Sequence, residues 1–137
     1  KKTYWAVVKN LPREEEGELV NYLVRNEKQN KSYAYDKEVP GSKKAILHYR
    51  PIGRSQNYYL LEIDLKTGRH HQIRCQLAKM GCPIKGDLKY GSPRSNPDGS
   101  ICLHARYIRF VHPVSKEPIE VEAPVPPGNL WNGFETI

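Results

Sequence analysis

The sequence predicts an α+β domain, in which a mostly antiparallel or mixed sheet is combined with few helices. Three observations support this class. Alternating apolar and polar residues mark several strands, one segment has clear helical periodicity, and short turn-forming segments join neighbouring strands into hairpins. A chain of 137 residues, of which 38% are hydrophobic, is long enough to bury one core. We therefore expect one domain or a part of one.

The first predicted strand lies near the N-terminus, where residues 4–8 carry apolar side chains on both faces. This pattern is typical of a strand in the interior of a sheet. Further strands are expected where apolar residues alternate with polar ones and where turn-forming residues separate them. They are residues 44–49 and 58–65 with a turn at 51–57, and residues 103–111 and 119–123 with a turn at 112–115.

The main helix signal follows the strand at residues 58–65. Ile73, Leu77 and Met80 fall at positions i, i+4 and i+7, so they share one apolar face. Thr67 is the predicted N-cap of this helix, and Gly81 is expected to end it. Arg69 and His71 would then lie on its first turn.

Two other segments are irregular or less periodic. A short helix is predicted at residues 14–26, because Leu19 and Leu23 are at helical spacing and three glutamates fall in the first turn. Residues 27–42 are mostly polar and predict an irregular excursion or a hairpin. The tail after residue 124 is rich in proline, so it is expected to leave the sheet, held by Trp131 and Phe134.

The chain is basic, with 22 Lys and Arg against 15 Asp and Glu, a net charge of +7. Such a surface suits a partner rich in phosphate, although a basic surface that serves solubility alone is an equal alternative. The residues around the start of the predicted helix favour the first alternative. Arg69, His70, His71 and Arg74 gather where free helix N–H groups and the helix dipole attract phosphate. This clustering predicts a site that faces RNA.

Cysteine usage predicts the compartment. Cys75, Cys82 and Cys102 occur in a chain with neither a secretory signal segment nor an apolar run long enough to span a membrane. We expect buried free thiols, a cytoplasmic location and no membrane partner. The alternative is a zinc site that combines these cysteines with His104, but the chain has no C-x-x-C pair. No metal is therefore expected.

Several motifs occur in a fixed order along the chain. They are Lys2-x-Tyr4-x-Ala6, residues 67–74 (Thr-Gly-Arg-His-His-Gln-Ile-Arg), residues 81–91 with Gly86-Asp87 and Tyr90-Gly91, then Leu103-His104-Ala105 and His112-Pro113. Together they resemble the C-terminal portion of the catalytic domain of RluA-type RNA pseudouridine synthases. The resemblance covers the chain from residue 2 to about residue 126, and residues 11–53 are its least diagnostic part.

The resemblance implies a pseudouridine synthase catalytic-domain fold that is incomplete at its N-terminus. Residues 1–126 would be the C-terminal portion of that domain, and residues 127–137 a tail. The implied activity is the isomerisation of uridine to pseudouridine in ribosomal or transfer RNA. No cofactor is implied, because the reaction consumes neither redox equivalents nor phosphate energy. The expected partner is RNA, and a monomer is expected.

The chain departs from the family in three places. The family usually has a small hydroxyl residue where this chain has His70, and a histidine where it has Gln76. Its catalytic aspartate belongs to an Arg-Leu-Asp motif upstream of the tyrosine motif, and no aspartate of this chain follows Arg-Leu. We therefore expect the chain to be inactive by itself. The alternative is a module of the same fold that binds RNA without isomerising it.

Three residues form the centre of the site that the resemblance implies. Tyr4 corresponds to the family's active-site tyrosine, which stacks on uracil and assists removal of the C5 proton; from its strand pattern alone, it is a packed aromatic residue. Arg74 corresponds to the arginine that pairs with the catalytic aspartate, and a structural ion pair is the alternative. Ile73 corresponds to the aliphatic residue that packs against the target base.

Four further residues are candidates for RNA contacts. Arg69 and His71 are expected to contact phosphate or ribose, and a structural hydrogen bond is an equal alternative for His71. Lys85 and Lys89 on the following loop are candidates as well, with a solvated charge as the alternative. The residues expected to shape the loop beside the site, without acting chemically, are Gly86, Asp87, Tyr90 and Gly91.

Overall fold

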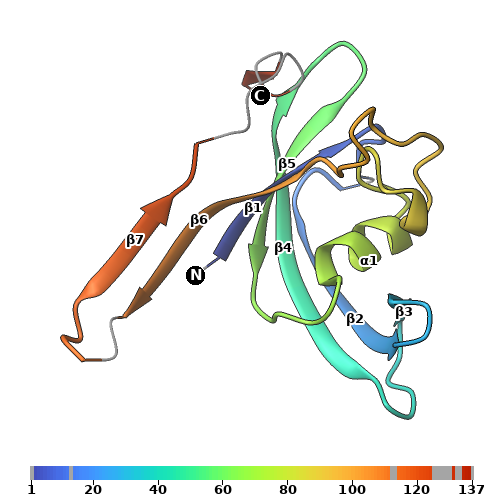
Figure 1. The fold of residues 1–137 in the computed structure, drawn as a ribbon, viewed down its shortest axis with the longest axis horizontal. Coiled ribbons are helices and arrows are strands. Elements are labelled where there is room, and N and C mark those ends of the chain that lie inside the picture. The colour runs from blue at the N-terminus through green and yellow to red at the C-terminus, as the bar shows by residue number, and fades with distance from the viewer. Residues whose placement is uncertain (1, 13, 112–113, 125–130, 132–133, 137) are drawn as a thin grey trace.

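The sheet of this protein has eight strands, and its described strand pairs are all antiparallel (Figure 1). The computed structural model describes residues 2–12, 14–111, 114–124, 131 and 134–136. Seven strands follow one another in the order β3-β2-β4-β5-β1-β6-β7, and β8 pairs with β4. The predicted α+β class is confirmed. The elements are β1 (Lys2–Val8), β2 (Gly17–Asn26), β3 (Lys31–Tyr35), β4 (Lys43–Arg54), β5 (Tyr59–Leu65), α1 (Gln72–Lys79), the 3-10 helix η1 (Leu88–Tyr90), β6 (Leu103–Val111), β7 (Pro118–Glu122) and β8 (Glu135–Thr136).

Strand β1 lies between β5 and β6, as its two apolar faces predict. Ala6, Val7 and Val8 have no exposed surface. The pairing of β1 with β6 changes register between Thr3 and Tyr4. Such an irregularity redirects the side chains next to it, and here it adjoins the candidate tyrosine.

Strands β4 and β5 form the predicted hairpin, but β4 is longer than expected. It continues through Pro51 to Arg54, and the register changes between Pro51 and Gly53. A proline is tolerated in a strand at such an irregularity, because its missing N–H is not needed for the ladder there. The predicted turn at residues 51–57 is therefore too long. In the actual turn, the Ser55 N–H donates to the Tyr58 carbonyl at 2.9 Å.

The helix predicted at residues 14–26 is wrong, because most of this segment forms strand β2. Burial alternates along β2. Asn21 and Leu23 are buried, whereas Val20, which precedes Asn21, is 40% exposed. The apolar residues of the segment fit the helical and the strand period alike, and pairing with both β3 and β4 decides for the strand. The predicted excursion after it contains β3, which makes a hairpin with β2.

Helix α1 begins later than predicted, at Gln72, and Thr67 is not its N-cap. The Thr67 hydroxyl donates to the Gln72 side-chain oxygen at 2.8 Å and accepts the Ile46 N–H of β4 at 2.9 Å. His71 occupies the N-cap position with φ of 54°, in the left-handed region that few residues other than glycine adopt. Arg69 and His71 therefore precede the helix. Gly81, with φ of 92°, ends it as predicted.

The apolar face of α1 packs on the sheet. Ile73 and Leu77 belong to one core cluster with residues such as Leu47 of β4 and Leu61 of β5. The three cysteines are buried and unpaired, as predicted. Within the described ranges, no group of three or more side chains is arranged to hold a metal ion. In that same part of the chain, no helix has the length and apolarity that a membrane crossing requires.

The predicted hairpin of β6 and β7 is confirmed, and it projects from the body of the sheet as an arm (Figure 1). Its predicted turn includes His112 and Pro113, which lie outside the described residues. In the tail, Trp131 and Phe134 pack against the core, as predicted. The tail does not simply leave the sheet, because β8 pairs with β4 at Gly53 and Arg54.

Candidate functional site

Arg74 lies on the first turn of α1, and its guanidinium forms a bidentate ion pair with Asp87. Arg74 Nε donates to Oδ2 at 2.9 Å, and Nη2 donates to Oδ1 at 2.8 Å. The Asp87 side chain is 1% exposed and that of Arg74 is 20% exposed. The hydrogen bond with Asp87 is the main cause that raises the pKa of Arg74. The guanidinium is thus charged and fixed in its orientation.

His71 and Tyr90 contact other parts of the Arg74 guanidinium. Arg74 Nη1 donates to His71 Nε2 at 3.1 Å, and the guanidinium carbon lies 5.0 Å from the centre of the Tyr90 ring. The Tyr90 hydroxyl lies 2.8 Å from His71 Nδ1 and also accepts the Ser32 N–H at 2.9 Å. Tyr90 of η1 therefore connects the start of α1 with β3.

These hydrogen bonds assign the protonation state of His71. Its Nε2 accepts from Arg74, so the ring proton lies on Nδ1 and is donated to Tyr90. Burial, together with the positive charge of Arg74, lowers the pKa of His71 to about 4. His71 is therefore a neutral acceptor at physiological pH, and it positions Arg74.

Two of the five N–H groups of Arg74 have no acceptor among the described residues. The other three, one each on Nε, Nη1 and Nη2, bind Asp87 and His71. Oxygen atoms of a carboxylate or a phosphate match these two remaining donors. A second anion can thus bind Arg74 without displacing Asp87.

His70, one of the two departures from the family within this segment, connects the start of α1 with the β2–β3 hairpin. Its Nδ1 lies 2.9 Å from Ser32 Oγ, and its Nε2 lies 3.0 Å from Asn30 Oδ1. Its ring stacks on His71 with 3.8 Å between the ring centres. His70 therefore makes contacts that a small hydroxyl residue is too short to make.

Gln76, the other departure, is fully buried under α1. Its Nε2 donates to Asn21 Oδ1 at 3.0 Å and to the Ala45 carbonyl at 3.2 Å. These bonds tie the helix to β2 and β4. Its Oε1 atom has no hydrogen-bond partner among the described residues, so the replacement leaves one buried acceptor unsatisfied.

The two lysines predicted as RNA contacts already have partners within the protein. Lys85 binds the Asn96 side-chain oxygen and lies over the Tyr58 ring. Lys89 donates to the carbonyls of Gln29 and Asn30, at 3.1 and 3.0 Å, and so holds the β2–β3 turn. Neither lysine is a simple solvated charge.

Tyr4 lies on β1 opposite Ile63 of β5 and Ala105 of β6. It is half-buried, packs against the core cluster that contains Ile73, and lines a cavity of about 220 Å³ together with Lys2 and Arg106. Arg74 does not belong to the described residues that line this cavity. Ile73 is 5% exposed and belongs to the core. The structure thus joins Tyr4 and Ile73 through the core but gives no direct contact between Tyr4 and Arg74.

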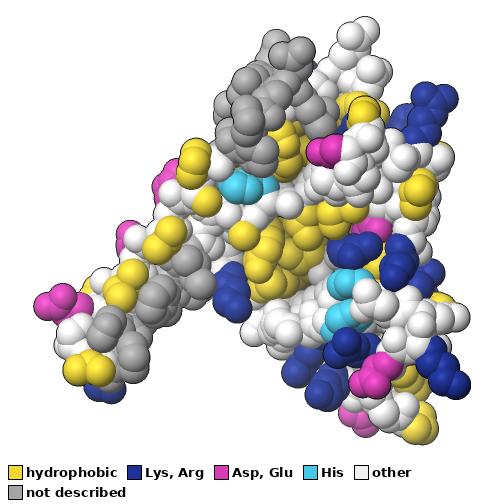
Figure 2. All heavy atoms as spheres, in the orientation of Figure 1, with side chains coloured by type: hydrophobic (Ala, Val, Ile, Leu, Met, Phe, Trp, Pro, Cys, Tyr) yellow, Lys and Arg dark blue, Asp and Glu magenta, His cyan; other side chains and the backbone are white. Residues whose placement is uncertain are grey.

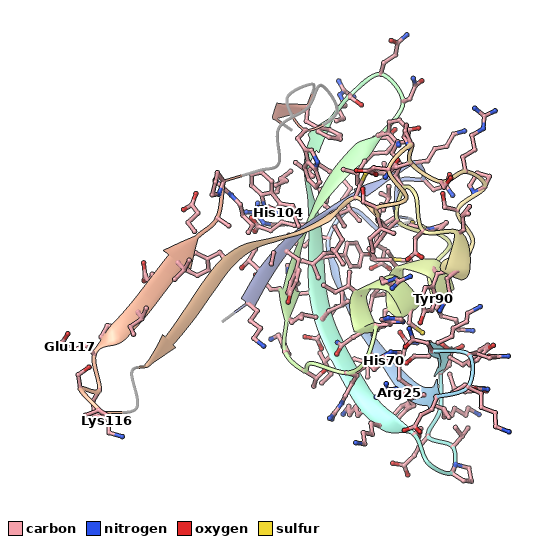
Figure 3. All side chains as sticks on the ribbon, viewed as in Figure 1. Arg25, His70, Tyr90, His104, Lys116 and Glu117 are labelled. Carbon is pink, nitrogen blue, oxygen red and sulfur yellow. The ribbon has the colours of Figure 1, made fainter. Side chains whose placement is uncertain are left out.

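The surface views show how these groups are distributed. A patch of hydrophobic side chains lies between α1 and the β6–β7 arm, with histidine, lysine and arginine side chains beside it (Figure 2). Arg25, His70 and Tyr90 lie at the corner where α1 meets the β2–β3 hairpin, whereas Lys116 and Glu117 lie at the tip of the arm (Figure 3). The basic groups near α1 therefore border an apolar surface.

The sequence interpretation missed Asp87 as the partner of Arg74 and Tyr90 as the residue that connects the network. One signal was available, because Asp87 and Asp98 are the only acidic residues between positions 66 and 100. An arginine at the boundary of the core needs a nearby acid, and Asp87 belongs to a recognised motif. Ser32 had no such signal, since its role depends on how β3 meets α1.

Comparison with known proteins shows which family this chain belongs to. The model of the RNA pseudouridylate synthase family matches residues 1–79. The chain is 35% identical over 123 residues to the uncharacterized RNA pseudouridine synthase YlyB of Bacillus subtilis, covering 90% of this chain and 40% of that protein. It is 40% identical over 100 residues to the ribosomal large subunit pseudouridine synthase D of Haemophilus ducreyi, covering 64% of this chain and 31% of that protein.

A solved structure agrees in fold. Human RNA Pseudouridylate Synthase Domain Containing 1 superimposes with a TM-score of 0.76 at 21% identity, over 99% of this chain and 59% of that one. The chain belongs to the RNA pseudouridylate synthase family, and the resemblance to RluA-type enzymes is confirmed. It spans between 31% and 40% of the length of the first curated relatives that it matches.

Proposed function

We propose that the protein containing this chain isomerises uridine to pseudouridine in ribosomal or transfer RNA, and that residues 1–126 belong to its catalytic domain, with 127–137 as a tail. Family membership supports the reaction class. The observation that carries the proposal for this site is the guanidinium of Arg74, which Asp87 and His71 hold in place while two N–H groups remain for another anion.

The reaction breaks the bond between C1′ of the ribose and N1 of uracil, rotates the base, and joins C1′ to C5. The C5 proton is released to solvent, and N1 takes up a proton, so no atom is gained or lost overall. It needs a carboxylate beside the sugar, a group that accepts the C5 proton, and a pocket for a base flipped out of its stack. We assign to Arg74 the role of orienting that carboxylate and keeping it ionised. Tyr4 is assigned to the base and its C5 proton, and Ile73 to the floor of the base pocket.

The carboxylate itself is proposed to come from an Arg-Leu-Asp segment that these 137 residues do not contain. Asp87 does not fill this role, because both of its carboxylate oxygens already bind Arg74 and its side chain is only 1% exposed. We propose that Arg69 contributes to RNA binding, along with His71, Lys85 and Lys89 through the loops that they hold. We propose that the protein is a monomer. A cytoplasmic location is proposed as well, in keeping with three buried unpaired thiols.

Release of tritium from RNA labelled at C5 of uridine tests this function. The protein containing this chain should release tritium in proportion to pseudouridine formed, and Tyr4→Phe should reduce turnover at least tenfold. Tyr33→Phe is the matched control, because Tyr33 is an exposed tyrosine of β3, and it should leave turnover unchanged. Binding of RNA without any tritium release, by a protein that includes an Arg-Leu-Asp segment, would instead support a binding module without catalysis.

A further inference from the structure

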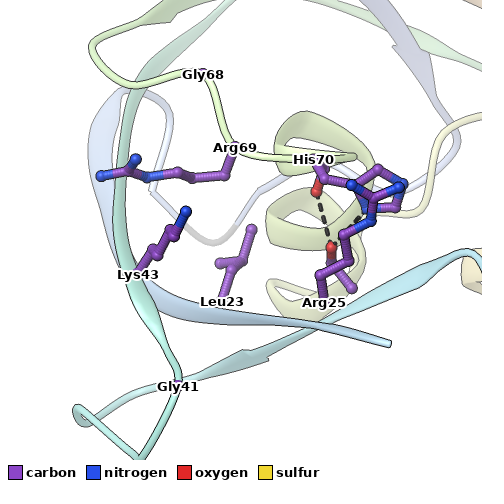
Figure 4. A pocket seen from close by; sticks show the side chains of 8 residues that line it. Leu23, Arg25, Gly41, Lys43, Gly68, Arg69 and His70 are labelled. Atoms are coloured by element: carbon purple, nitrogen blue, oxygen red, sulfur yellow. Dashed lines mark hydrogen bonds between the residues drawn. The ribbon is translucent and has the colours of Figure 1, made fainter. Parts of the chain in front are cut away.

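A second basic cavity lies away from Tyr4, where the loop before α1 faces the β2–β3 hairpin and β4 (Figure 4). Its volume is about 300 Å³, which is at the lower end of the range for ligand sites. We call it the hairpin cavity. It is lined by Leu23, Arg25, Ser32, Gly41, Lys43, Gly68, Arg69 and His70.

Three cations line the hairpin cavity without neutralisation by a nearby acid. Among the described residues, no carboxylate lies within 4.0 Å of Arg25, Lys43 or Arg69. Arg69 Nε donates to the Lys44 carbonyl at 2.9 Å, which fixes its side chain and leaves its two terminal nitrogen atoms available. Exposed cations that the protein does not pair are suited to an anion from outside.

The positive groups occupy opposite walls of the hairpin cavity. The Lys43 side chain and the guanidinium of Arg69 lie on the side of β4, Arg25 lies beside His70 on the other side, and Leu23 lies between them (Figure 4). The pKa of His70 reflects this positive charge. Burial is the main cause that lowers this pKa, and the charge of Arg25 is the next largest cause. A single anionic group between the walls would therefore gain from both sides.

The walls are held in place before any ligand binds. Ser32 Oγ donates to the His70 carbonyl at 2.9 Å, which fastens β3 to the loop before α1. Lys89 fastens the turn between β2 and β3 through the carbonyls of Gln29 and Asn30. A site that is already arranged loses less entropy when it binds.

We propose that the hairpin cavity binds a backbone phosphate of the RNA, at a site separate from Arg74 and Tyr4. This inference rests on the proposed function, which makes RNA the substrate. The chemistry of the lining favours phosphate and sugar over a base. The lining contains no Phe, Tyr or Trp on which a base stacks, and the His70 ring already stacks on His71. Phosphate contacts fix the register of RNA, and base contacts are left to the proposed site around Tyr4 and Ile73.

Fluorescence anisotropy with a short labelled oligouridylate tests the site. Arg25→Gln and Lys43→Gln should each weaken binding about fivefold to tenfold and lower the slope of log affinity against log salt by about 0.7, the loss of one phosphate contact on a single strand. Arg54→Gln and Lys9→Gln are the controls, because they remove the same charges from exposed positions outside the cavity. They should change affinity by less than about twofold.

Three results would overturn the hairpin cavity as an RNA site. The first is equal affinity loss in the cavity variants and the controls, and the second is no RNA binding by the unaltered chain. The third is displacement of the oligouridylate by submillimolar inorganic phosphate, which would indicate a site for a free anion. These binding results are independent of tritium release. If the protein fails to isomerise uridine but Arg25→Gln still weakens its RNA binding, the proposed reaction is refuted and the hairpin cavity is still supported as an RNA site.

Discussion

The guanidinium of Arg74 and the carboxylate of Asp87 form a two-point ion pair between α1 and the turn before η1. The resemblance to the family led us to expect the catalytic aspartate as the partner of Arg74. Asp87 instead binds the Nε edge of the guanidinium, and the opposite part is held by His71. Arg74 is therefore oriented even without a nucleophile.

Asp87→Asn should destabilise the fold by about 3 kcal/mol, because it leaves the partly buried Arg74 charge without its counter-ion. Urea unfolding measures this loss. Asp36→Asn is the matched control, since both side chains of its ion pair are exposed and Asp36 Oδ2 lies 3.9 Å from Lys79 Nζ. Its pair should contribute less than about 1 kcal/mol. Similar losses in the two variants would show that the Arg74 pair is not a structural anchor.

His71 makes the stability of the protein dependent on pH. Its pKa is about 4 in the folded protein and near 6.5 in an unfolded chain, so the unfolded state binds the extra proton first. The free energy of unfolding should therefore fall as pH decreases from about 6.5 to about 4 and level off below that. His71→Asn, which suits the left-handed backbone, should flatten this dependence. An unchanged slope would place the titration elsewhere.

Gly86 has φ of 88°, and a Cβ atom there would lie 2.6 Å from Asn96 Nδ2 and 2.7 Å from the Ser100 carbonyl oxygen. Gly86→Ala should thus destabilise the protein by more than the roughly 1–2 kcal/mol that an alanine in the left-handed conformation costs. Gly81→Ala is the control, because Gly81 has the same handedness and nothing within 4 Å. Unfolding in urea should separate the two variants clearly. Equal losses would mean that the loop yields to the added methyl group.

Gln76 tests how the chain tolerates its departure from the family. Gln76→Leu should cost about 2 kcal/mol, because the Asn21 side-chain oxygen loses its donor in a buried place. Gln76→His restores the residue usual in the family and retains an N–H donor, so its cost should stay below about 1 kcal/mol. Thermal or urea unfolding distinguishes these outcomes. A histidine variant as unstable as the leucine variant would refute the role assigned to the amide N–H.

The strands and the main helix were predictable where one face of an element is buried. Alternation placed the hairpins of β4 with β5 and of β6 with β7, and periodic residues such as Ile73 and Leu77 placed α1. The helix predicted over β2 failed because its apolar residues fit two periods, and only pairing with β3 and β4 decides between them. The start of α1 was misplaced because Thr67 bonds to β4.

The site was predictable where a motif carries the chemistry, and less so where it depends on long-range contacts. Arg74 was found from its motif, but its partners Asp87 and Tyr90 were expected only to shape a loop. Ser32 was missed, because it meets His70 through the packing of β3 against the loop before α1. No local pattern records such a contact between distant segments.

The role of Arg74 in orienting a carboxylate is tested most directly by tritium release from RNA in a double variant. Arg74→Ala together with Asp87→Asn removes both charges, so the folded protein should regain most of the stability that either single variant loses. If Arg74 orients the carboxylate, turnover should nevertheless stay at least about a hundredfold below that of the unaltered protein, with RNA affinity nearly unchanged. Turnover that recovers along with stability would contradict this role.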